Sequence, residues 1–220
     1  MNMNQTDIYL VRHGETHWNA DRRIQGVTEA SLNDKGREQA QKVGQELSNL
    51  CIEAVYSFPL KRAQETSEII GAFHGCGLFI DAMLHEGKFG ELEGTTISDF
   101  YQKYAEAIRA RHELSRKERL HHKYVPGSES IHEIVTRVVP SLQHIARTHM
   151  GENVIVVTHG FVMGNLLVIL GGDDEREILV GNGGVLHLKG DGLTLYVVKH
   201  QGIEFKTPQE IEFRMERIRK

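Results

Sequence analysis

The run Val154 to Val157 limits the folds open to this chain more than any other stretch of the sequence. Its side chains are all β-branched and aliphatic, and because neighbouring side chains of a strand point to opposite faces, such a strand is apolar on both faces. Strands of this kind are typical of the covered centre of a parallel sheet. A helix is predicted from about Phe161, and an amphipathic helical pattern precedes the run, formed by Ile131, Ile134, Val135, Val138, Leu142 and Ile145. The run therefore predicts a central strand with helices packed on both sides.

The same alternation of short apolar strands and helical patterns occurs in the first half of the chain. Strands are predicted at Ile8–Val11, Ile52–Tyr56 and Leu78–Ile80. One helix is predicted to begin after Asn33 as its N-cap, and another near Pro59. This order of elements is typical of strands that lie parallel and are connected by helices.

The later part of the chain has a different pattern. Val185–Leu188 and Leu193–Val198, joined by the turn Gly190-Asp191-Gly192, predict a β-hairpin. A capping box at Thr207–Glu210 predicts a helix in the tail. Together the patterns predict the fold class α/β, as a three-layer α/β/α sandwich around a mostly parallel, doubly wound sheet.

Length, composition and charge narrow the class of protein. With 220 residues, 40% of them hydrophobic, and no repeat or linker, we expect a single domain over residues 1–220. A formal net charge of −4 gives no general attraction to nucleic acid or to an anionic membrane, so neither is an expected partner. The polar start Met1 to Asp7 and the lack of a long apolar run predict a cytoplasmic protein.

Basic side chains follow three of the predicted strands at the point where each strand ends. Arg12 and His13 follow the first strand, and His159 follows the central run. Arg62 lies in the first turn after the second strand. Because the carboxyl ends of parallel strands meet at one edge of a sheet, we expect these side chains to converge. Guanidinium and imidazole donors match the oxygens of a tetrahedral anion, which makes phosphate the predicted ligand.

One of these histidines is a candidate nucleophile. A neutral imidazole attacks phosphorus with one ring nitrogen while a backbone acceptor holds the proton on the other, and His13 fits this role. A carboxyl group is also needed for the leaving oxygen, and Glu86 is the best candidate, with Glu91 and Glu93 of the same loop as open alternatives. His13 and His17 lie four residues apart, but in a glycine-containing loop rather than in the H-E-x-x-H helix of zinc enzymes, so no metal site is predicted.

Five short motifs occur in chain order between residues 8 and 160. They are Arg12-His13-Gly14-Glu15-Thr16 with Asn19, Ser57-x-x-Leu60-x-Arg62-Ala63-x-x-Thr66, Glu86-x-x-Phe89-Gly90-x-x-Glu93-Gly94, Pro126-Gly127-x-Glu129-Ser130 and Thr158-His159-Gly160. A lone RHG triplet occurs by chance, whereas the ordered set is specific. The set resembles the histidine phosphatase superfamily, in its cofactor-dependent phosphoglycerate mutase branch. The resemblance implies a phosphoglycerate mutase-like fold.

The resemblance also implies a role for each residue of the predicted site. His13 would form a phosphohistidine intermediate, and Glu86 would act first as general acid and then as general base. No metal ion or other cofactor is implied. By the same resemblance, Arg12, Asn19, Arg62 and His159 would hold the phosphoryl oxygens with help from the Gly160 amide, and Gln25 and Gly26 would line the substrate mouth.

The choice between phosphatase and mutase depends on a predicted lid segment at about 87–125. Glycolytic mutases of the family carry a long insertion here, with extra arginines that bind a bisphosphate. In this chain the stretch Thr95–Val125 is short, no paired arginine of that kind aligns within it, and its basic run Arg109–Lys123 is interpreted as a solvated helical face. Hydrolysis of a small phosphomonoester is therefore favoured. The alternative is a phosphoglycerate mutase, and only then would 2,3-bisphosphoglycerate be needed as a primer.

Substrate and partners are less constrained. Phosphoserine-specific relatives can carry a histidine near the acid loop, and Phe89 stands in that position, which weakens a phosphoserine assignment. A second alternative is a non-catalytic phospho-ligand binding module, which is disfavoured because His13, Arg62, Glu86 and His159 are all present. The expected partner is a small phosphorylated metabolite. Because dimers are common in the family, a homodimer is a candidate assembly.

Overall fold

The computed structural model describes residues 5–171 and 177–206, so the helix predicted at Thr207–Glu210 lies outside the described residues. Six strands form one sheet in the order β3-β2-β4-β1-β5-β6. Their bounds are β1 Thr6–Arg12, β2 Ile52–Ser57, β3 Gly77–Ile80, β4 Asn153–Thr158, β5 Glu177–Gly190 and β6 Leu195–Lys206. The strands β3, β2, β4 and β1 are parallel, whereas β5 runs antiparallel to β1 and β6 antiparallel to β5. The sheet is mostly parallel, as predicted.

The apolar run of the sequence forms the middle of β4. This strand pairs in parallel with β1 on one side and with β2 on the other. Val154 to Val157 are each fully buried. The burial is explained by helices on both faces of the sheet, which cover side chains of either orientation. The prediction of a covered central strand is therefore confirmed.

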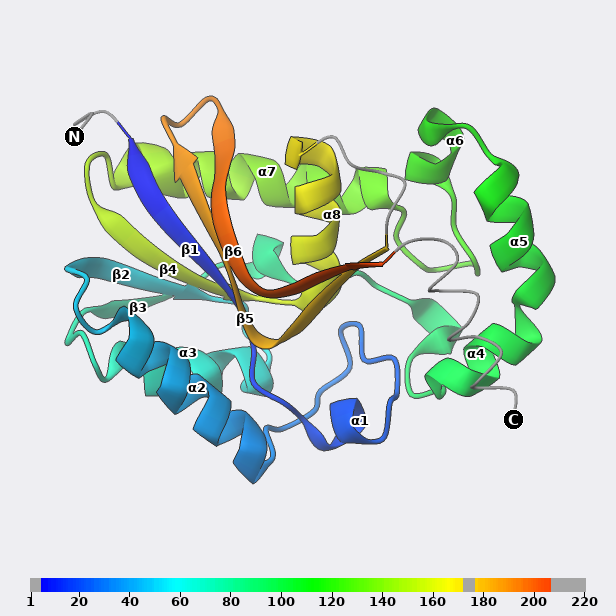
Figure 1. Ribbon diagram of the computed structural model, residues 1–220, viewed down its shortest axis with the longest axis horizontal. Coiled ribbons are helices and arrows are strands. Elements are labelled where there is room, and N and C mark those ends of the chain that lie inside the picture. The colour runs from blue at the N-terminus through cyan, green and yellow to red at the C-terminus, as the bar shows by residue number, and fades with distance from the viewer. Residues whose placement is uncertain (1–4, 172–176, 207–220) are drawn as a thin grey trace.

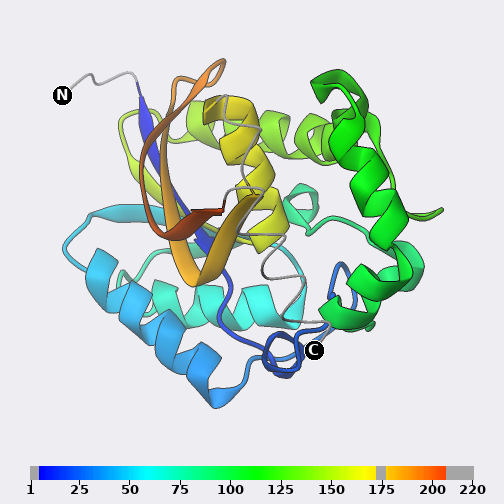
Figure 2. The same ribbon diagram turned by 45° about the vertical axis from the view of Figure 1, so that its right-hand side comes forward.

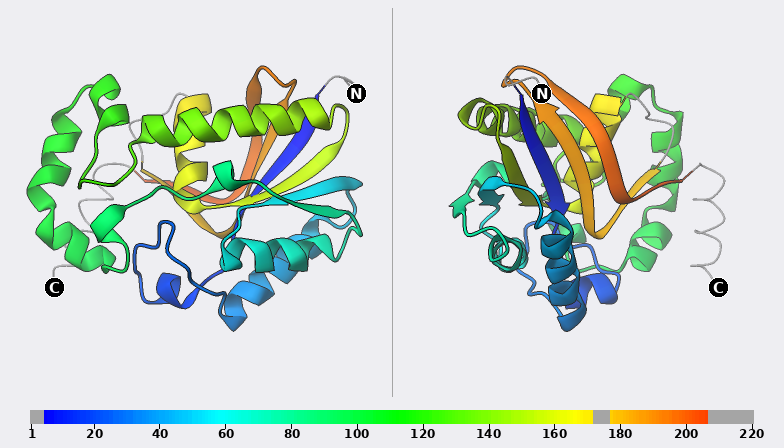
Figure 3. Two further views of the ribbon diagram at one scale, coloured as in Figure 1. Left: turned by 180° about the vertical axis from the view of Figure 1, so that it is seen from behind. Right: turned by 60° about the vertical axis from the view of Figure 1, so that its left-hand side comes forward.

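Two pairs of long helices form the outer layers. In Figure 1, α2 (Asp34–Leu47) and α3 (Lys61–Gly71) lie on one face of the sheet, and α7 (Ile131–Thr148) and α8 (Gly160–Gly171) lie on the other. The view from behind in the left panel of Figure 3 shows the same three layers, with the sheet between α7 and the pair α2 and α3. The Asn33 side chain caps α2 by accepting the Gly36 N–H at 2.8 Å. The three-layer α/β/α architecture is confirmed.

Several boundaries differ from the sequence expectations. The loop after β1 contains a one-turn helix, α1 (His17–Ala20), because Thr16 and Asn19 form a capping box. The helix expected near Pro59 begins at Lys61. The hairpin strands are longer than predicted, and Leu193 lies in the turn between them, 78% exposed. The long hairpin extends the sheet beyond β1, and β5 contributes directly to the candidate site.

The predicted lid segment includes an arm beside the sheet. After the short 3₁₀ turns η1 (Ala82–Leu84) and η2 (Gly90–Leu92), the arm consists of α4 (Ile97–Lys103), α5 (Ala105–Glu113) and α6 (Arg116–His121). Figures 1 and 2 show these three helices as an arch at one end of the molecule. The basic run is divided between two helices, because Ser115 caps the start of α6 with a capping box. Among the described residues, no helix is both long and apolar enough to span a bilayer.

Candidate active site

The pairing of β1 with β4 brings the two strand-end histidines together. Arg12 lies opposite Thr158 in the parallel register, so the next residue of each strand, His13 and His159, leaves the sheet at the same edge. The backbone N–H of His13 donates to the carbonyl of Thr158 at 3.1 Å. The two rings then meet edge to face with centroids 5.2 Å apart, and both side chains are buried. The convergence expected from strand order is present.

The His13 ring is held in one tautomer. Its Nδ1 lies 2.7 Å from the Gly14 carbonyl, which can only accept, so Nδ1 carries the proton and Nε2 carries the lone pair. Burial lowers the pKa of His13 well below its ordinary value, and the nearby charges of Arg62 and Arg12 lower it further. The imidazole is therefore held neutral, with a free electron pair on Nε2.

Several buried nitrogen atoms around this pair have no hydrogen-bond partner among the described residues. They are Nε of Arg12, Nε of Arg62 and both ring nitrogens of His159. The pKa of His159 is also lowered well below its ordinary value, first by burial and then by Arg62. Buried donors without a protein partner are costly unless a ligand pairs with them. The cluster is thus suited to the oxygens of an anion.

Arg62 connects this cluster to the loop before α2. It is fully buried, and its two terminal nitrogens donate to the carbonyls of Gly26 at 2.6 Å and Thr28 at 2.8 Å. Burial lowers the pKa of Arg62 to about 10. Gly26 adopts a φ of +55°, and a Cβ there would lie 2.1 Å from the Glu93 carboxylate. Gln25, beside it, is buried with its Oε1 unpartnered among the described groups. The loop predicted to line the substrate mouth is thus attached to a site arginine.

Arg12 is held by β5 and by the start of α8. Its Nη1 donates to the carbonyl of Val180. A Cβ on Gly160 would lie 3.0 Å from Arg12 Nε, so the guanidinium would have to shift by a few tenths of an ångström to accept a side chain there. Burial lowers the pKa of Arg12, which Glu86 partly opposes. The glycine after His159 thus allows the close approach of Arg12.

Asn19 belongs to α1 and lies next to the end of β1. Its Oδ1 accepts the N–H and the hydroxyl of Thr16, each at 3.1 Å. The same oxygen accepts Asn182 Nδ2 at 3.2 Å, and Asn182 also donates to the His13 carbonyl at 3.0 Å. Asn182 therefore contacts two residues of the candidate site, although no motif of the sequence includes it. The only signal for it in the sequence is its place in the glycine-rich stretch 181–184.

Glu86 is buried against the first turn of α8. Its Oε2 accepts the Phe161 N–H at 3.1 Å, and its Oε1 accepts the N–H groups of Val162 at 3.2 Å and Gly87 at 2.9 Å. Burial raises the pKa of Glu86, although the backbone N–H groups and the charges of Arg12 and Arg62 act in the opposite direction. A raised pKa favours the protonated carboxyl group that a general acid needs.

The other two carboxylates of the loop lie in different surroundings. Glu93 accepts the N–H groups of Val27, Thr28 and Phe89 and the hydroxyl of Thr28, so it connects the acid loop to the 25–28 loop. Glu91 is exposed, where it accepts the hydroxyl of Tyr104. Of the three carboxylates, Glu86 alone is buried, which supports its choice.

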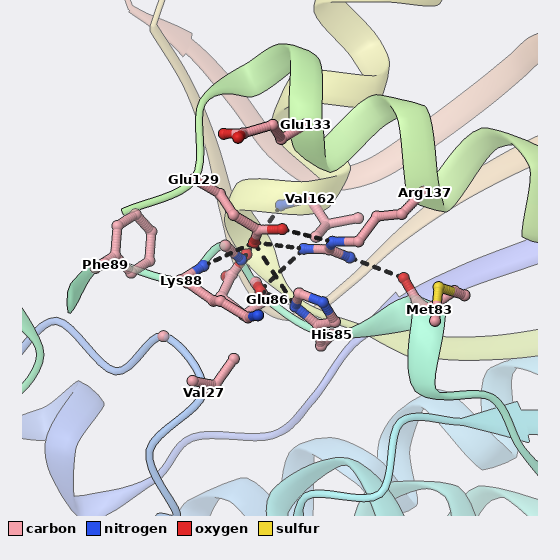
Figure 4. Close-up of polar contacts among 12 residues, drawn as sticks. Val27, Met83, His85, Glu86, Lys88, Phe89, Glu129, Glu133, Arg137 and Val162 are labelled. Carbon is pink, nitrogen blue, oxygen red and sulfur yellow. Dashed lines mark hydrogen bonds and ion pairs between the residues drawn. The ribbon is translucent and has the colours of Figure 1, made fainter. Parts of the chain in front are cut away.

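A second carboxylate, that of Glu129, helps to hold the Glu86 loop to α7, as Figure 4 shows. Glu129 accepts two hydrogen bonds from Arg137 of α7, at 3.0 and 3.1 Å, and one from the Lys88 N–H at 2.9 Å. Arg137 also donates to the carbonyls of Glu86 at 3.0 Å and Met83 at 2.8 Å. Burial alone would raise the pKa of Glu129, yet Arg137 and the Lys88 N–H lower it. Glu129 is part of a quoted motif, whereas nothing in the sequence indicated Arg137.

Comparison with known proteins identifies similar chains. The family model described as "Histidine phosphatase superfamily (branch 1)" matches residues 8–201. Phosphoglycerate mutase-like protein 4 of Arabidopsis thaliana is 41% identical over 167 residues, covering 73% of this chain and 69% of the relative. The solved structure of Bacillus stearothermophilus YhfR has a TM-score of 0.74 at 30% identity, covering 88% of this chain and 95% of that one. A mycobacterial glucosyl-3-phosphoglycerate phosphatase, with a TM-score of 0.72 at 23% identity over 87% of this chain and 96% of its own, shares the fold.

Proposed function

This chain belongs to the histidine phosphatase superfamily, and from that membership we propose that it is a metal-independent phosphatase that hydrolyses a small phosphomonoester through a phosphohistidine on His13. One observation carries the proposal. The Gly14 carbonyl fixes the proton on His13 Nδ1, so that Nε2 is a free nucleophile beside the buried unpartnered donors of Arg12, Arg62 and His159. Two guanidinium groups supply positive charge for the phosphoryl group, a role that a metal ion fills in many other phosphatases.

In the first step, His13 Nε2 attacks phosphorus, and the bond from phosphorus to the alcohol oxygen breaks. The leaving oxygen takes the proton of the Glu86 carboxyl group, whose raised pKa favours that form. Hydrogen-bond donors already in place around the phosphoryl oxygens stabilise the charge that builds up in the transition state. The products of the step are the free alcohol, a phosphohistidine and the Glu86 carboxylate.

In the second step, the Glu86 carboxylate takes a proton from water, and the water oxygen attacks phosphorus. The bond between phosphorus and Nε2 breaks, its electron pair returns to the ring, and phosphate leaves. His13 Nδ1 keeps its proton throughout, because the Gly14 carbonyl accepts it at 2.7 Å in the resting structure. The cycle restores both groups and needs no co-reactant other than water.

The short arm and the contacts of its arginines favour water, rather than a second substrate hydroxyl, as the acceptor of the phosphoryl group. The arm that α4, α5 and α6 form is short, and two of its arginines already donate to carbonyls of the arm itself. Arg109 donates to Ala105 at 3.4 Å, and Arg119 donates to Leu114 at 3.2 Å. A phosphoglycerate mutase is the second candidate, because the Arabidopsis relative is named phosphoglycerate mutase-like protein 4.

The test incubates the protein in EDTA with p-nitrophenyl phosphate, 3-phosphoglycerate, phosphoserine and sugar phosphates, and measures both phosphate release and isomerised product. We expect phosphate release that His13→Ala abolishes, while His144→Ala, an exposed histidine on α7, retains it. Conversion of 3- to 2-phosphoglycerate that depends on bisphosphoglycerate, with little phosphate released, would establish the mutase instead. Phosphate binding without any turnover would identify a binding module.

A further inference from the structure

The strand β5 is irregular beside the candidate site. Its pairing with β6 shifts register between Val180 and Val185, and Gly183 within this bulge has a φ of +72°. Gly183 packs against α2, where a Cβ would lie 3.5 Å from the side chains of Gln39 and Val43. A bulge redirects the side chains around it, and bulges are frequent next to active sites. Here the bulge contains Asn182, which the proposed mechanism does not use.

The amide of Asn182 makes two hydrogen bonds with one nitrogen. Nδ2 donates to the His13 carbonyl at 3.0 Å and to Asn19 Oδ1 at 3.2 Å. A carboxamide nitrogen carries two hydrogen atoms, so both bonds can form at once. The first bond attaches Asn182 to the backbone of the proposed nucleophile. The second reaches a residue predicted to hold the phosphoryl group.

The contacts of Asn19 decide which way its own amide faces. Its Oδ1 accepts three donors, namely the Thr16 N–H, the Thr16 hydroxyl and Asn182 Nδ2. An amide nitrogen cannot accept these donors, so the oxygen must occupy this position. The Nδ2 of Asn19 has no acceptor among the groups that the structure describes, and it remains available to an anion. The orientation follows from the donors and does not depend on a choice between two amide flips.

We propose that Asn182 is a positioning residue, an inference that rests on the proposed function. Asn182 is anchored to the His13 carbonyl, and it orients the Asn19 amide so that Asn19 Nδ2 donates to the phosphoryl group on His13. Thr16 alone already supplies two donors to Asn19 Oδ1, but Thr16 is the N-cap of α1, so these bonds are local to that helix. Asn182 adds a direct contact between the Asn19 side chain and the His13 backbone at the end of β1. It does so from the antiparallel part of the sheet, which the family motifs quoted for this chain do not include.

The test is a double-mutant cycle between the two asparagines, using Asn182→Ala, Asn19→Ala and the double variant. Hydrolysis of p-nitrophenyl phosphate and the affinity for inorganic phosphate, measured by calorimetry, are the two readouts. Asn182→Asp serves as a second variant of the same shape, because its carboxylate faces two acceptors and cannot donate. Asn153→Ala is the matched control, since Asn153 donates through Nδ2 to the Cys51 carbonyl at the other end of β4.

We expect Asn182→Ala to lower kcat/KM about 10- to 100-fold and to weaken phosphate binding. A loss of this size is usual for a group that orients a site residue without itself contacting the ligand. In the Asn19→Ala background, Asn182→Ala should lower kcat/KM by less than about 2-fold, because the residue through which Asn182 acts is gone. Asn182→Asp should lose at least as much activity as Asn182→Ala. Asn153→Ala should retain the wild-type values.

Two results would overturn the inference. One is an Asn182→Ala or Asn182→Asp protein with wild-type turnover and phosphate affinity. The other is an equal loss from Asn182→Ala with and without Asn19, which would indicate a general effect on the fold. If the wild-type protein shows no turnover, the proposed function fails, but the phosphate-binding cycle still decides the role of Asn182.

Discussion

The two halves of the candidate site are built in different ways. The phosphoryl half, with Arg12, His13 and His159, follows directly from the ends of β1 and β4, where backbone pairing fixes each residue. The leaving-group half carries Glu86 on a loop that side-chain contacts hold to α7 and α8. The first half therefore depends on the sheet and the second on a few polar contacts. In the proposed mechanism, the residues at the strand ends would hold the phosphoryl group, and the loop would supply the acid for the leaving group.

The largest expected effect comes from replacing Glu86, and its size should depend on the leaving group of the substrate. Glu86→Gln should slow hydrolysis of an alkyl phosphomonoester by roughly 10²–10⁴-fold, because the alkoxide then leaves without a proton. Hydrolysis of p-nitrophenyl phosphate should fall far less, since p-nitrophenolate is a good leaving group. The kcat/KM values on both substrates measure this, because kcat/KM reports the first step, whereas kcat also includes the second step, in which Glu86 acts as base. Equal losses on the two would remove Glu86 from the role of general acid and would return Glu91 and Glu93 to consideration.

Arg62→Lys tests the phosphoryl half. An ammonium group cannot donate to the Gly26 and Thr28 carbonyls and still present a donor in the position of the guanidinium Nε. We expect a loss of about 10²–10³-fold in kcat on alkyl and aryl substrates alike. Arg37→Lys, which changes a half-buried arginine paired with Glu65, is the control and should retain activity. A loss confined to alkyl substrates would place Arg62 in the leaving-group half.

The pH dependence of activity should distinguish the two halves of the site, because His13 sets the acid limb of the profile and Glu86 sets the alkaline limb. His13 must be neutral to attack, and because its pKa is lowered, its acid limb lies below the ordinary value of 6.5. Glu86 must be protonated to donate, and because its pKa is raised, activity should fall as pH rises through a value above 4.5. The alkaline limb should be strong for an alkyl substrate and should disappear in Glu86→Gln. The second ionisation of an alkyl phosphate, near pH 6, is the same for the wild type and Glu86→Gln, so the difference between these two profiles on one substrate isolates the limb of Glu86.

Arg137→Ala tests whether the loop needs its support. The change removes hydrogen bonds to Glu129 and to the Glu86 and Met83 carbonyls, so Glu86 should lose its fixed position. We expect a decrease of about 10-fold on alkyl substrates, with a smaller change on p-nitrophenyl phosphate. In the Glu86→Gln background the same change should have little further effect. A uniform loss on all substrates would contradict this role.

The smallest expected effect concerns the two other acidic residues of the loop. Glu93→Gln should lower the free energy of unfolding by about 1–3 kcal/mol, because the carboxylate accepts hydrogen bonds from Val27, Thr28 and Phe89. Glu91→Gln should change it by less than about 0.5 kcal/mol, since Glu91 is on the surface. Chemical denaturation measures both. The reverse order of the two values would be inconsistent with the contacts of Glu93.

The sequence predicted the phosphoryl half better than the leaving-group half, for a physical reason. His13 and His159 each stand directly after an apolar strand, and strand pairing is a local rule that carries both to one edge. Glu86 was chosen from three carboxylates by motif position alone, because its surroundings depend on α8, which begins 74 residues later in the chain. Arg137 was not identified, since a single arginine in an amphipathic helix carries no sign of the loop it contacts.

By itself, the sequence determined the covered central strand, the alternation of strands and helices, and the placement of imidazole and guanidinium groups at strand ends. These follow from the period of side chains along a strand or helix and from the parallel pairing of neighbours. Only the tertiary structure decided the tautomer of His13, the surroundings that distinguish Glu86 from Glu93, and the contact of Asn182 with Asn19. Those outcomes depend on which donors and acceptors meet across distant segments. Hydrogen bonds of that kind have no period along the chain, so they become visible only when the segments are packed together.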